Sequence, residues 1–286
     1  MENRMERAHI VQFKTSLIED EKSIATIRKY TKDVEAFFDF VGENAVTKEV
    51  VIRYKQHLKE KYKPSSVNSM LAAVNKFLKE MGWYDCAVKT LKVQRQAFRS
   101  RERELTKEEY FRLLKAAKDR KNMRLYLLMQ TICSTGIRVS ELQYITVQAV
   151  ATQQATVSLK GKTRIVLIPS ALCRELKNYA KENGIQSGSI FITKNGIPLD
   201  RSNILHGMKA LCETAGVDRC KVFPHNLRHL FACLFYKVEK DLSRLADLLG
   251  HSNVNTTRIY TCVSGEEQAR QIEKLGLVVR EKKKTA

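Results

Sequence analysis

Residues 135–142 have the sequence TGIRVSEL and follow a long apolar stretch. The pattern predicts helix over about residues 123–145, with Gly136 marking a break in an otherwise buried helical region. Arg138 lies at that break, and a guanidinium in apolar surroundings needs a partner. The simplest alternative is a helix-surface ion pair between Arg138 and Glu141, which lies three residues further on.

A β-hairpin is predicted downstream, because β-branched residues at positions 155–168 flank the turn sequence KGKT at positions 160–163. The Gly-Lys-Thr of this turn resembles the end of a phosphate-binding loop. However, Thr156 stands where that loop needs its first glycine, so this interpretation is rejected. Lys160 and Lys162 remain as two basic residues at or near the hairpin tip.

Another helix is predicted to start at residues 224–229, which have the sequence PHNLRH. His225 and Arg228 are one turn apart on it, so one face can present an imidazole and a guanidinium together. His225 and His229 have a spacing that can suit zinc. Asn226 follows His225, however, and no metalloprotease glutamate is present, so no metal site is expected.

The last segment of interest is LLGHS at residues 248–252, followed by Tyr260 nine residues after His251. The chain contains ten tyrosines, and packing in a core is the ordinary role of any one of them. No single segment identifies a function.

In combination, these segments resemble the tyrosine recombinase (phage integrase) family in content, order and spacing, in the compact two-domain form of Xer-type and transposon integrases. The resemblance rests on the Gly-x-Arg-x-Ser-Glu-Leu box around Arg138, on Lys160 in the hairpin, on His225-x-x-Arg228, on the Leu-Leu-Gly-His251 box and on Tyr260.

The resemblance implies a site-specific recombinase that cleaves and rejoins DNA through a covalent 3′-phosphotyrosyl intermediate, for integration, excision or resolution of a DNA element. Tyr260 is then the nucleophile. Arg138 and Arg228 bind the non-bridging phosphate oxygens, which planar guanidinium groups match well. Lys160 protonates the leaving 5′-oxygen, with Lys162 as a rival for this role. Neither a metal ion nor a cofactor is expected.

The remaining motif residues have assisting roles in this scheme. His225 helps to remove the proton of Tyr260, and His251 donates a hydrogen bond to the phosphate. Glu141 orients its neighbours, and His229 is a buttress within its helix.

The first part of the chain is predicted to be a helical bundle. Apolar residues recur at helical spacing over residues 23–41 and about 47–62, and again from Pro64 to a stop at Gly82. By resemblance, residues 1–100 form a SAM-like core-binding domain that binds DNA.

A second domain, with a C-terminal tail, is predicted for residues 101–286, because Thr106 and Glu109 have the spacing of a capping box. The expected fold is therefore mainly α with a small antiparallel β-sheet: a helical core-binding domain followed by a mixed α/β catalytic domain of the tyrosine recombinase type.

A basic linker at about residues 89–104 joins the two domains, with six basic and two acidic residues. Arg95, Arg99 and Arg101 are expected to contact DNA phosphates, although a solvated run of charge has the same composition.

The amino-acid composition also indicates DNA as the partner. The 51 lysines and arginines exceed the 31 acidic residues, for a net charge of +20. No apolar run approaches the ~18 residues of a membrane span, so double-stranded DNA with specific recombination sites is the expected partner.

The seven cysteines are odd in number and form no Cys-x-x-Cys pair, which indicates reduced thiols and a cytoplasmic protein. The family resemblance suggests a bacterial source.

The chain enters its core-binding pattern near residue 10, which leaves no room for the arm-binding domain of larger integrases. Family resemblance also implies a tetramer on DNA. The tail has an apolar stripe formed by Ala269, Ile272, Leu275 and Val278. Family members often pass such a segment to a neighbouring protomer, but packing within its own domain predicts the same periodicity.

Two other functions remain open. A type IB topoisomerase-like enzyme shares the tyrosine chemistry but joins no two defined sites. A DNA-binding regulator without chemistry predicts that a catalytic position is replaced, and none is.

Overall fold

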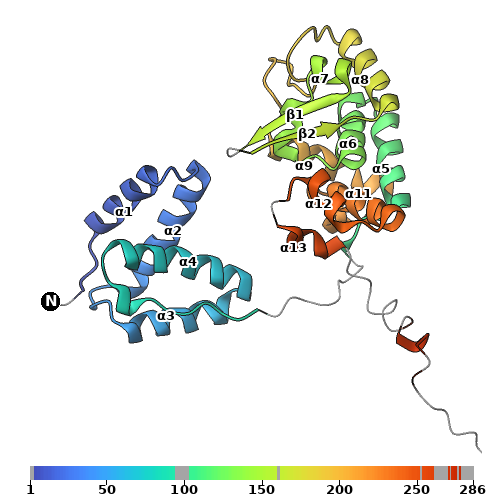
Figure 1. Ribbon diagram of the computed structural model, residues 1–286. Helices are drawn as coiled ribbons and strands as arrows, with labels where there is room; N and C mark the ends of the chain where they lie inside the picture. The colour runs from blue at the N-terminus through green and yellow to red at the C-terminus, as the bar shows by residue number, and fades with distance from the viewer. Residues whose placement is uncertain are drawn as a thin grey trace, which may run out of the picture. The chain divides into compact units, whose positions relative to one another are not determined.

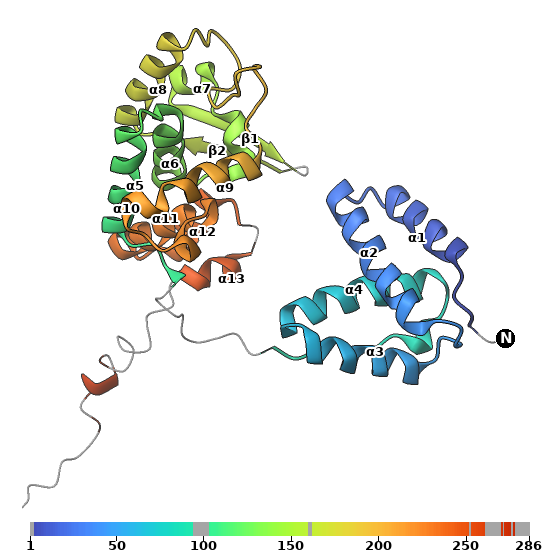
Figure 2. The same cartoon turned by 180° about the vertical axis from the view of Figure 1, so that it is seen from behind.

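The computed structural model describes residues 3–93, 103–159, 162–251, 253–260, 270, 272–275 and 277. The chain divides into two compact units, Met1–Arg95 and Gln96–Ala286. Each unit has its own hydrophobic core, and Figures 1 and 2 show each from opposite sides.

The regular elements in the described part of unit 1 are all helices. Its elements are α1 (Arg7–Glu19), α2 (Ile24–Val41), α3 (Lys48–Lys61), α4 (Pro64–Glu80) and the short 3-10 helix η1 (Tyr84–Cys86). Side-chain oxygens of Ser23 and Thr47 cap α2 and α3 by accepting backbone N–H bonds, and Pro64 begins α4. The three helices predicted here are confirmed.

The core of unit 1 is rich in aromatic rings. Phe13 of α1 meets Phe77 of α4 edge to face, with ring centroids 5.5 Å apart. Phe37 and Tyr54 lie 5.0 Å apart on α2 and α3. Each such pair contributes about 0.5–1.5 kcal/mol beyond burial of its area. Contacts between α2 and α4 join the two pairs of helices into one bundle.

Unit 2 is larger and mixed. Its elements are α5 (Lys107–Asp119), α6 (Met123–Thr135), η3 (Val139–Tyr144), α7 (Val147–Thr152), β1 (Gln154–Leu159), β2 (Lys162–Leu167), α8 (Ser170–Glu182), α9 (Arg201–Ala210), α10 (Cys212–Ala215), η4 (Arg219–Lys221), α11 (Pro224–Glu239), α12 (Leu242–Leu249), α13 (Val254–Thr257) and η5 (Arg258–Tyr260).

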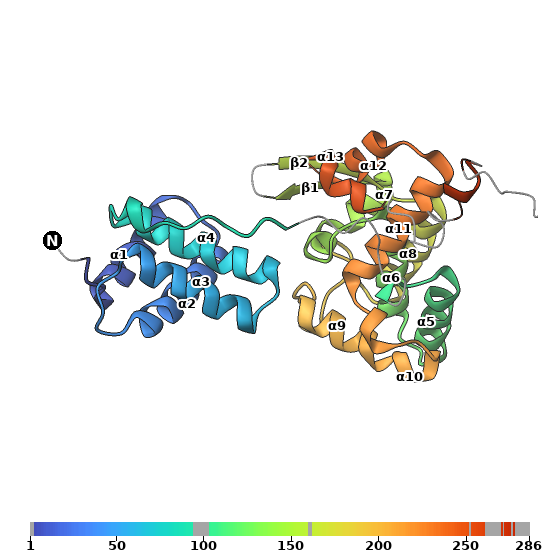
Figure 3. The ribbon, with the colours of Figure 1, turned by 90° about the horizontal axis from the view of Figure 1, so that it is seen from below.

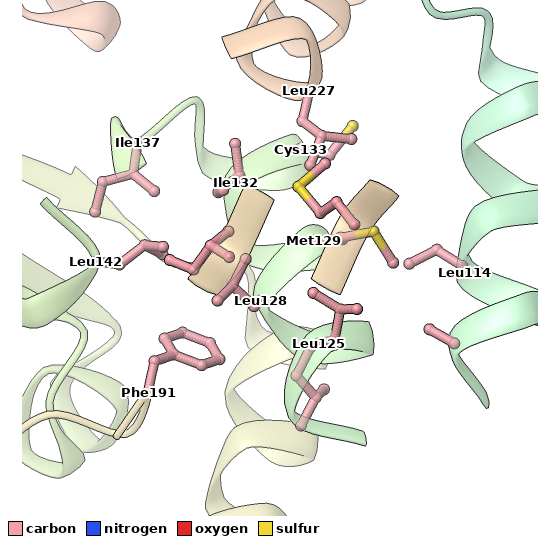
Figure 4. Close-up of a cluster of buried hydrophobic side chains, with 14 of the residues drawn as sticks. Leu114, Leu125, Leu128, Met129, Ile132, Cys133, Ile137, Leu142, Phe191 and Leu227 are labelled. Atoms are coloured by element: carbon pink, nitrogen blue, oxygen red, sulfur yellow. The ribbon is translucent and has the colours of Figure 1, made fainter. Parts of the chain in front are cut away.

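Helix α6 lies at the centre of unit 2, in contact with α5, α8, α9 and α11. Its side chains are buried nearly all round, as expected for a helix surrounded by others. In Figure 4, Leu128, Met129 and Ile132 of α6 lie among side chains from several elements, including Leu114 of α5 and Leu227 of α11.

The predicted hairpin is confirmed as a two-stranded antiparallel sheet. Gln154 pairs with Leu167 at one end and Leu159 with Lys162 at the other. Val157 and Val166 are buried, whereas Ile165 on the opposite face is exposed. This alternation places one face of the hairpin against the core.

The predicted helix over residues 123–145 is wrong in its second half. Helix α6 ends at Thr135 because Gly136 takes a left-handed φ of +65°. A Cβ on Gly136 would lie only 2.5 Å from the Phe231 ring, so only glycine fits this turn. The chain resumes as η3, with Arg138 as the residue that precedes it.

The predicted start of the first long helix of unit 2 is confirmed. Thr106 and Glu109 form both hydrogen bonds of the predicted capping box, 3.1 and 2.8 Å long. The fold class, mainly α with one small antiparallel sheet, is confirmed. Within the described ranges, no helix is long and apolar enough to cross a membrane.

Candidate active site

Arg138 and Glu141 form the first part of the site. Arg138 Nη1 donates to Glu141 Oε1 at 2.8 Å, and the Arg138 backbone N–H donates to Oε2 at 2.9 Å. Glu141 is only 2% exposed, while the Arg138 side chain is 39% exposed. This pair is therefore not the surface ion pair that local spacing also allowed: a buried carboxylate holds a guanidinium whose outer side remains open.

Arg164 on β2 is a second guanidinium bound to Glu141, and sequence reasoning missed it. Its Nη2 donates to Glu141 Oε2 at 2.6 Å, and its Nη1 donates to the carbonyl of Leu248 at 2.6 Å. It shares the inward face of β2 with buried Val166, and that alternation was the signal available in the sequence. Arg164 thus joins the hairpin to η3 and to the end of α12.

Two opposing effects set the protonation of Glu141. Burial raises the pKa of Glu141, whereas hydrogen bonds from Arg138 and the charge of Arg164 lower it, and the net shift is downward. Glu141 is therefore ionised at neutral pH and offsets part of the positive charge of the site.

Gly250 makes room for Arg164. Its φ is +63°, and a Cβ there would lie 2.4 Å from Cδ of Arg164. The Gly250 carbonyl also accepts a bond from Arg138 Nη2 at 3.2 Å. The glycine before His251 is thus required both by its backbone conformation and by the close passage of an arginine.

Arg228 is the most deeply buried of the three guanidinium groups, with 1% exposure on α11. It donates to the Gly136 carbonyl at 2.5 Å and to the Leu249 carbonyl at 2.7 Å. Burial, followed by the charge of Arg138, lowers the pKa of Arg228 to about 10, so it stays charged at neutral pH. Arg228 lies on α11 and Leu249 ends α12, and α12 contacts both α11 and α13 (Figure 3).

His251 is held between Arg228 and Thr257. Its Nε2 lies 3.0 Å from Nη2 of Arg228, and its Nδ1 lies 2.9 Å from Oγ1 of Thr257. A guanidinium can only donate, so Nε2 accepts and the ring proton is on Nδ1, where it is donated to Thr257. Burial, then the charge of Arg228, lowers the pKa of His251 to about 4, so the ring is neutral.

Tyr260 lies against both histidine rings of the site. Its ring stacks on His251 with centroids 6.2 Å apart and planes 14° apart, and it meets His229 edge to face at 5.1 Å. Tyr260 is 5% exposed and close enough to Arg228 for a phenolate charge to raise the pKa of that arginine. Cys233 Sγ lies 3.2 Å from Nδ1 of His229, a contact that sequence reasoning did not anticipate.

The two residues of the His225-x-x-Arg228 motif lie in different environments. His225 is exposed at the first turn of α11, whereas Arg228 is buried one turn later. That one face of the helix presents both groups together stays a prediction. His225 is still near enough for its charge to lower the pKa of His251.

Several predicted residues lie outside the described ranges: Lys160 at the hairpin tip, Arg95, Arg99 and Arg101 in the linker, and Ala269 and Val278 in the tail. Lys162 begins β2, directly beyond the turn. The structure thus brings together Arg138, Glu141, Arg228, His229, His251 and Tyr260.

Comparison with protein families gives two matches. Residues 103–267 match the model of the phage integrase family, and residues 10–83 match the phage integrase N-terminal SAM-like domain. The two matches fall in the two compact units.

The comparison with individual proteins agrees with the two family matches. The chain is 32% identical to the tyrosine recombinase XerA of Thermococcus kodakarensis over 283 residues, which is 93% of this chain and 96% of that protein. This relative gives no support to a bacterial source.

Two solved structures have a similar fold. A XerH site-specific recombinase bound to a palindromic difH substrate has a TM-score of 0.73 at 18% identity, covering 90% of this chain and 81% of that one. A lambda integrase tetramer bound to a Holliday junction has a TM-score of 0.69 at 18% identity, covering 86% and 77%.

Proposed function

The chain belongs to the phage integrase family and is a site-specific tyrosine recombinase that cleaves and rejoins DNA, and we propose that Tyr260 is its nucleophile. One observation carries this proposal: Tyr260 stacks on His251, which is hydrogen-bonded to the buried Arg228. A phosphate bound beside Arg228 is then also beside the tyrosine hydroxyl.

In the proposed step, Tyr260 Oη attacks phosphorus and the bond from phosphorus to the 5′-oxygen breaks. The products are a 3′-phosphotyrosyl bond and a free 5′-hydroxyl, and the proton of the tyrosine passes to a base such as His225. Rejoining reverses the step with the 5′-hydroxyl of another strand. One ester replaces another, so no external energy source is needed.

Arg138 and Arg228 are proposed to bind the two non-bridging oxygens. Arg228 is held by two carbonyls, and Arg138 by Glu141 and Gly250, before DNA arrives. Such fixed charges stabilise the extra negative charge of the transition state without reorganising during the reaction. The 39% exposure of Arg138 leaves one edge open to a phosphate.

His251 must change its hydrogen bonding to donate to the phosphate. In the free protein its Nε2 accepts from Arg228, so that atom has no proton to give. A bound phosphate would draw Arg228 toward its oxygens, and its negative charge would raise the pKa of His251. We propose that His251 then becomes protonated at Nε2 and donates, while Thr257 keeps the ring in place through Nδ1.

Lys160 is the proposed general acid for the leaving 5′-oxygen, and Lys162 remains its rival. In the sequence Lys160 follows β1 directly, and the hairpin is held to the site by the bond from Arg164 of β2 to Glu141. Separate substitution of each lysine by glutamine, assayed on DNA with a 5′-phosphorothiolate leaving group that needs no proton, identifies the acid. Only the variant lacking the acid recovers its rate on that substrate.

We further propose that the protein acts as a tetramer on two duplexes that carry specific sites, with units 1 and 2 joined by the basic linker at about residues 89–104 and Arg95, Arg99 and Arg101 contacting phosphates. The lambda integrase tetramer on a Holliday junction is a precedent for this assembly. Exchange of the tail between protomers is part of this proposal. Ile272 and Leu275 are 61% and 64% exposed in the single chain.

A recombinase is favoured over a type IB topoisomerase because the relative that covers 93% of the chain is a tyrosine recombinase. A regulator without chemistry is disfavoured because each motif position keeps its residue. The joining of two defined sites separates a recombinase from a relaxing enzyme.

The test uses nicked duplexes that carry a candidate site, found by searching the DNA on either side of the gene for inverted repeats around a short spacer. Wild type should form a covalent adduct that survives SDS and carries DNA through its 3′-phosphate. Tyr260→Phe should bind the same DNA without an adduct. Tyr236→Phe is the matched control, because Tyr236 packs against the same small cluster and should leave adduct formation unchanged. An adduct that persists in Tyr260→Phe would disprove the assignment.

A further inference from the structure

The short helix η3 is bonded to both strands of the hairpin. Glu141 of η3 accepts a bond from Arg164 of β2 at 2.6 Å. The hydroxyl of Tyr144, the last residue of η3, donates to the backbone carbonyl of Ser158 on β1 at 2.5 Å. The hairpin is thus tied to one element of the active site by a bond on each strand.

The geometry of a 3-10 helix explains why one short helix can hold both strands. Such a helix has three residues per turn, so residues three apart lie on the same side. Glu141 and Tyr144 are three apart on η3, and Arg138 directly precedes its first residue. Arg138 also donates to Glu141 at 2.8 Å, so the hairpin and the proposed phosphate-binding arginine are held by the same side of η3.

The two bonds lie at neighbouring positions near the tip of the hairpin. Ser158 pairs with Thr163, whose hydroxyl donates to Ser158 Oγ at 3.3 Å. Arg164 is the next residue of β2. The pair of Leu159 with Lys162 lies closer to the turn. The end of the hairpin that carries the two lysines is therefore held by η3 as well as by the core.

The two bonds differ in what else they hold. Glu141 binds Arg138 as well as Arg164. Arg164 also donates to the carbonyl of Leu248, so its loss would disturb a phosphate-binding arginine and the end of α12 together with the hairpin. Among the described hydrogen bonds, that of the Tyr144 hydroxyl reaches only the backbone of β1. Tyr144 therefore offers a way to loosen the hairpin and leave the arginines in place.

We propose that Tyr144 is a positioning residue for the general acid of DNA cleavage. By fixing β1 two residues before Lys160, its hydroxyl holds the hairpin lysine at the leaving 5′-oxygen of a phosphate bound by Arg138. Proton transfer requires the two atoms to lie within about 2.6–3.2 Å, and a two-stranded hairpin is only marginally stable by itself. The inference rests on the proposed function in taking a hairpin lysine, Lys160 or Lys162, as the acid.

A leaving group that needs no proton tests this role. Cleavage is measured in single turnovers of the full chain, with enzyme in excess, on nicked duplexes that carry a candidate site. One duplex has the ordinary 5′-oxygen at the scissile phosphate, and the other has a bridging 5′-sulfur, which leaves without an acid. A residue that acts only through the general acid should affect cleavage of the first substrate and not of the second.

Tyr144→Phe removes the hydroxyl and keeps the ring, which packs against the core of unit 2. Cleavage of the 5′-oxygen substrate should slow about 5-fold, as expected for the loss of one neutral hydrogen bond. Cleavage of the 5′-sulfur substrate should change by less than about 1.5-fold. Tyr179→Phe is the matched control, because Tyr179 packs against the same core from α8, and it should leave both rates unchanged.

Double substitutions test whether the hydroxyl acts through the lysine. Lys160→Gln and Lys162→Gln are each assayed alone and together with Tyr144→Phe. In the variant that lacks the acid, adding Tyr144→Phe should slow cleavage of the 5′-oxygen substrate no further, because no acid is left to position. In the other lysine variant, the loss caused by Tyr144→Phe should persist.

Equal slowing of both substrates by Tyr144→Phe would overturn the inference, because the hydroxyl would then act on the arginines or the nucleophile. An unchanged rate on the 5′-oxygen substrate, or additive losses with both lysine substitutions, would overturn it as well. Recovery of a lysine variant on the 5′-sulfur substrate, without recovery of Tyr144→Phe, rejects the role of Tyr144 and keeps the proposed general acid. If neither lysine variant recovers, the proposed acid and this inference both fail, while adduct formation tests Tyr260 separately.

Discussion

Replacing Arg164 by methionine should destabilise unit 2 strongly, because the guanidinium makes two short bonds in a nearly buried place. Its partners are Glu141 and the Leu248 carbonyl, each at 2.6 Å, and its side chain is 15% exposed. Methionine keeps much of the apolar stem but donates no hydrogen bond. The change therefore removes bonding with little change in packing.

The expected loss of stability depends on the hydrogen bonds that Glu141 keeps in the variant. Loss of a hydrogen bond to a charged group costs about 1.5–3 kcal/mol, and orphaning a buried charge costs about 3–5 kcal/mol. Glu141 keeps its bonds from Arg138, so the cost lies near the lower figure of that range, at about 3 kcal/mol. For a unit of this size, at about 2–4 °C per kcal/mol, the unfolding midpoint falls by about 6–12 °C.

Calorimetry of the full chain measures this shift in the transition of unit 2, with Arg174→Met on the exposed face of α8 as control. The control should stay within about 0.5 kcal/mol of wild type. A double-mutant cycle with Glu141→Gln should give a coupling of about 1–3 kcal/mol. If Arg164→Met falls within 1 kcal/mol of Arg174→Met, the guanidinium does not tie the hairpin to the site and the reasoning fails.

Two further outcomes are expected. Gly250→Ala should destabilise more than Gly216→Ala. Both glycines have positive φ, but a Cβ at Gly250 would lie 2.4 Å from Arg164, whereas nothing lies within 4 Å of a Cβ at Gly216. Equal urea midpoints of the two variants would contradict this. His251 should make stability fall as pH falls from ~6.5 toward 4, because its pKa is lowered to about 4 and the unfolded chain therefore takes up the proton first. Urea titrations of His251→Asn should show a smaller fall over that window, and parallel curves would count against the assignment.

The features that the sequence predicted well are those decided by neighbours along the chain. The capping box of Thr106 and Glu109, the starts of α2 and α3 near residues 23 and 47 and the pairing of β1 with β2 depend on contacts within a few residues. The order and spacing of the motif residues were also sufficient to indicate the family.

The features that were missed depend on distant contacts. Arg164 reaches Glu141 across 23 residues and Leu248 across 84, so no local pattern indicated its partners. Helix α1 was not predicted, because exposed Val11 and Ile18 obscure the stripe formed by Phe13 and Leu17.

The different burial of His225 and Arg228 shows what helical periodicity cannot predict. Residues three apart on a helix differ by about 60° in direction, since three steps of ~100° complete most of a turn. At the edge of a packed face, that difference is sufficient to bury Arg228 and expose His225. Spacing indicates which residues are neighbours, but not on which side of the packing boundary each one lies.

The acceptors that hold the three arginines explain how the site remains positive. Four of them are backbone carbonyls at the C-terminal ends of α6 and α12: Gly136, Leu248, Leu249 and Gly250. Helix C-termini carry unpaired carbonyls and partial negative charge, which stabilise cations without neutralising them. Glu141 is the single carboxylate bound to Arg138 and Arg164 among the described ion pairs. Three guanidinium charges against one carboxylate leave the site positively charged, and a second carboxylate in place of those carbonyls would have halved the net charge available to a phosphate.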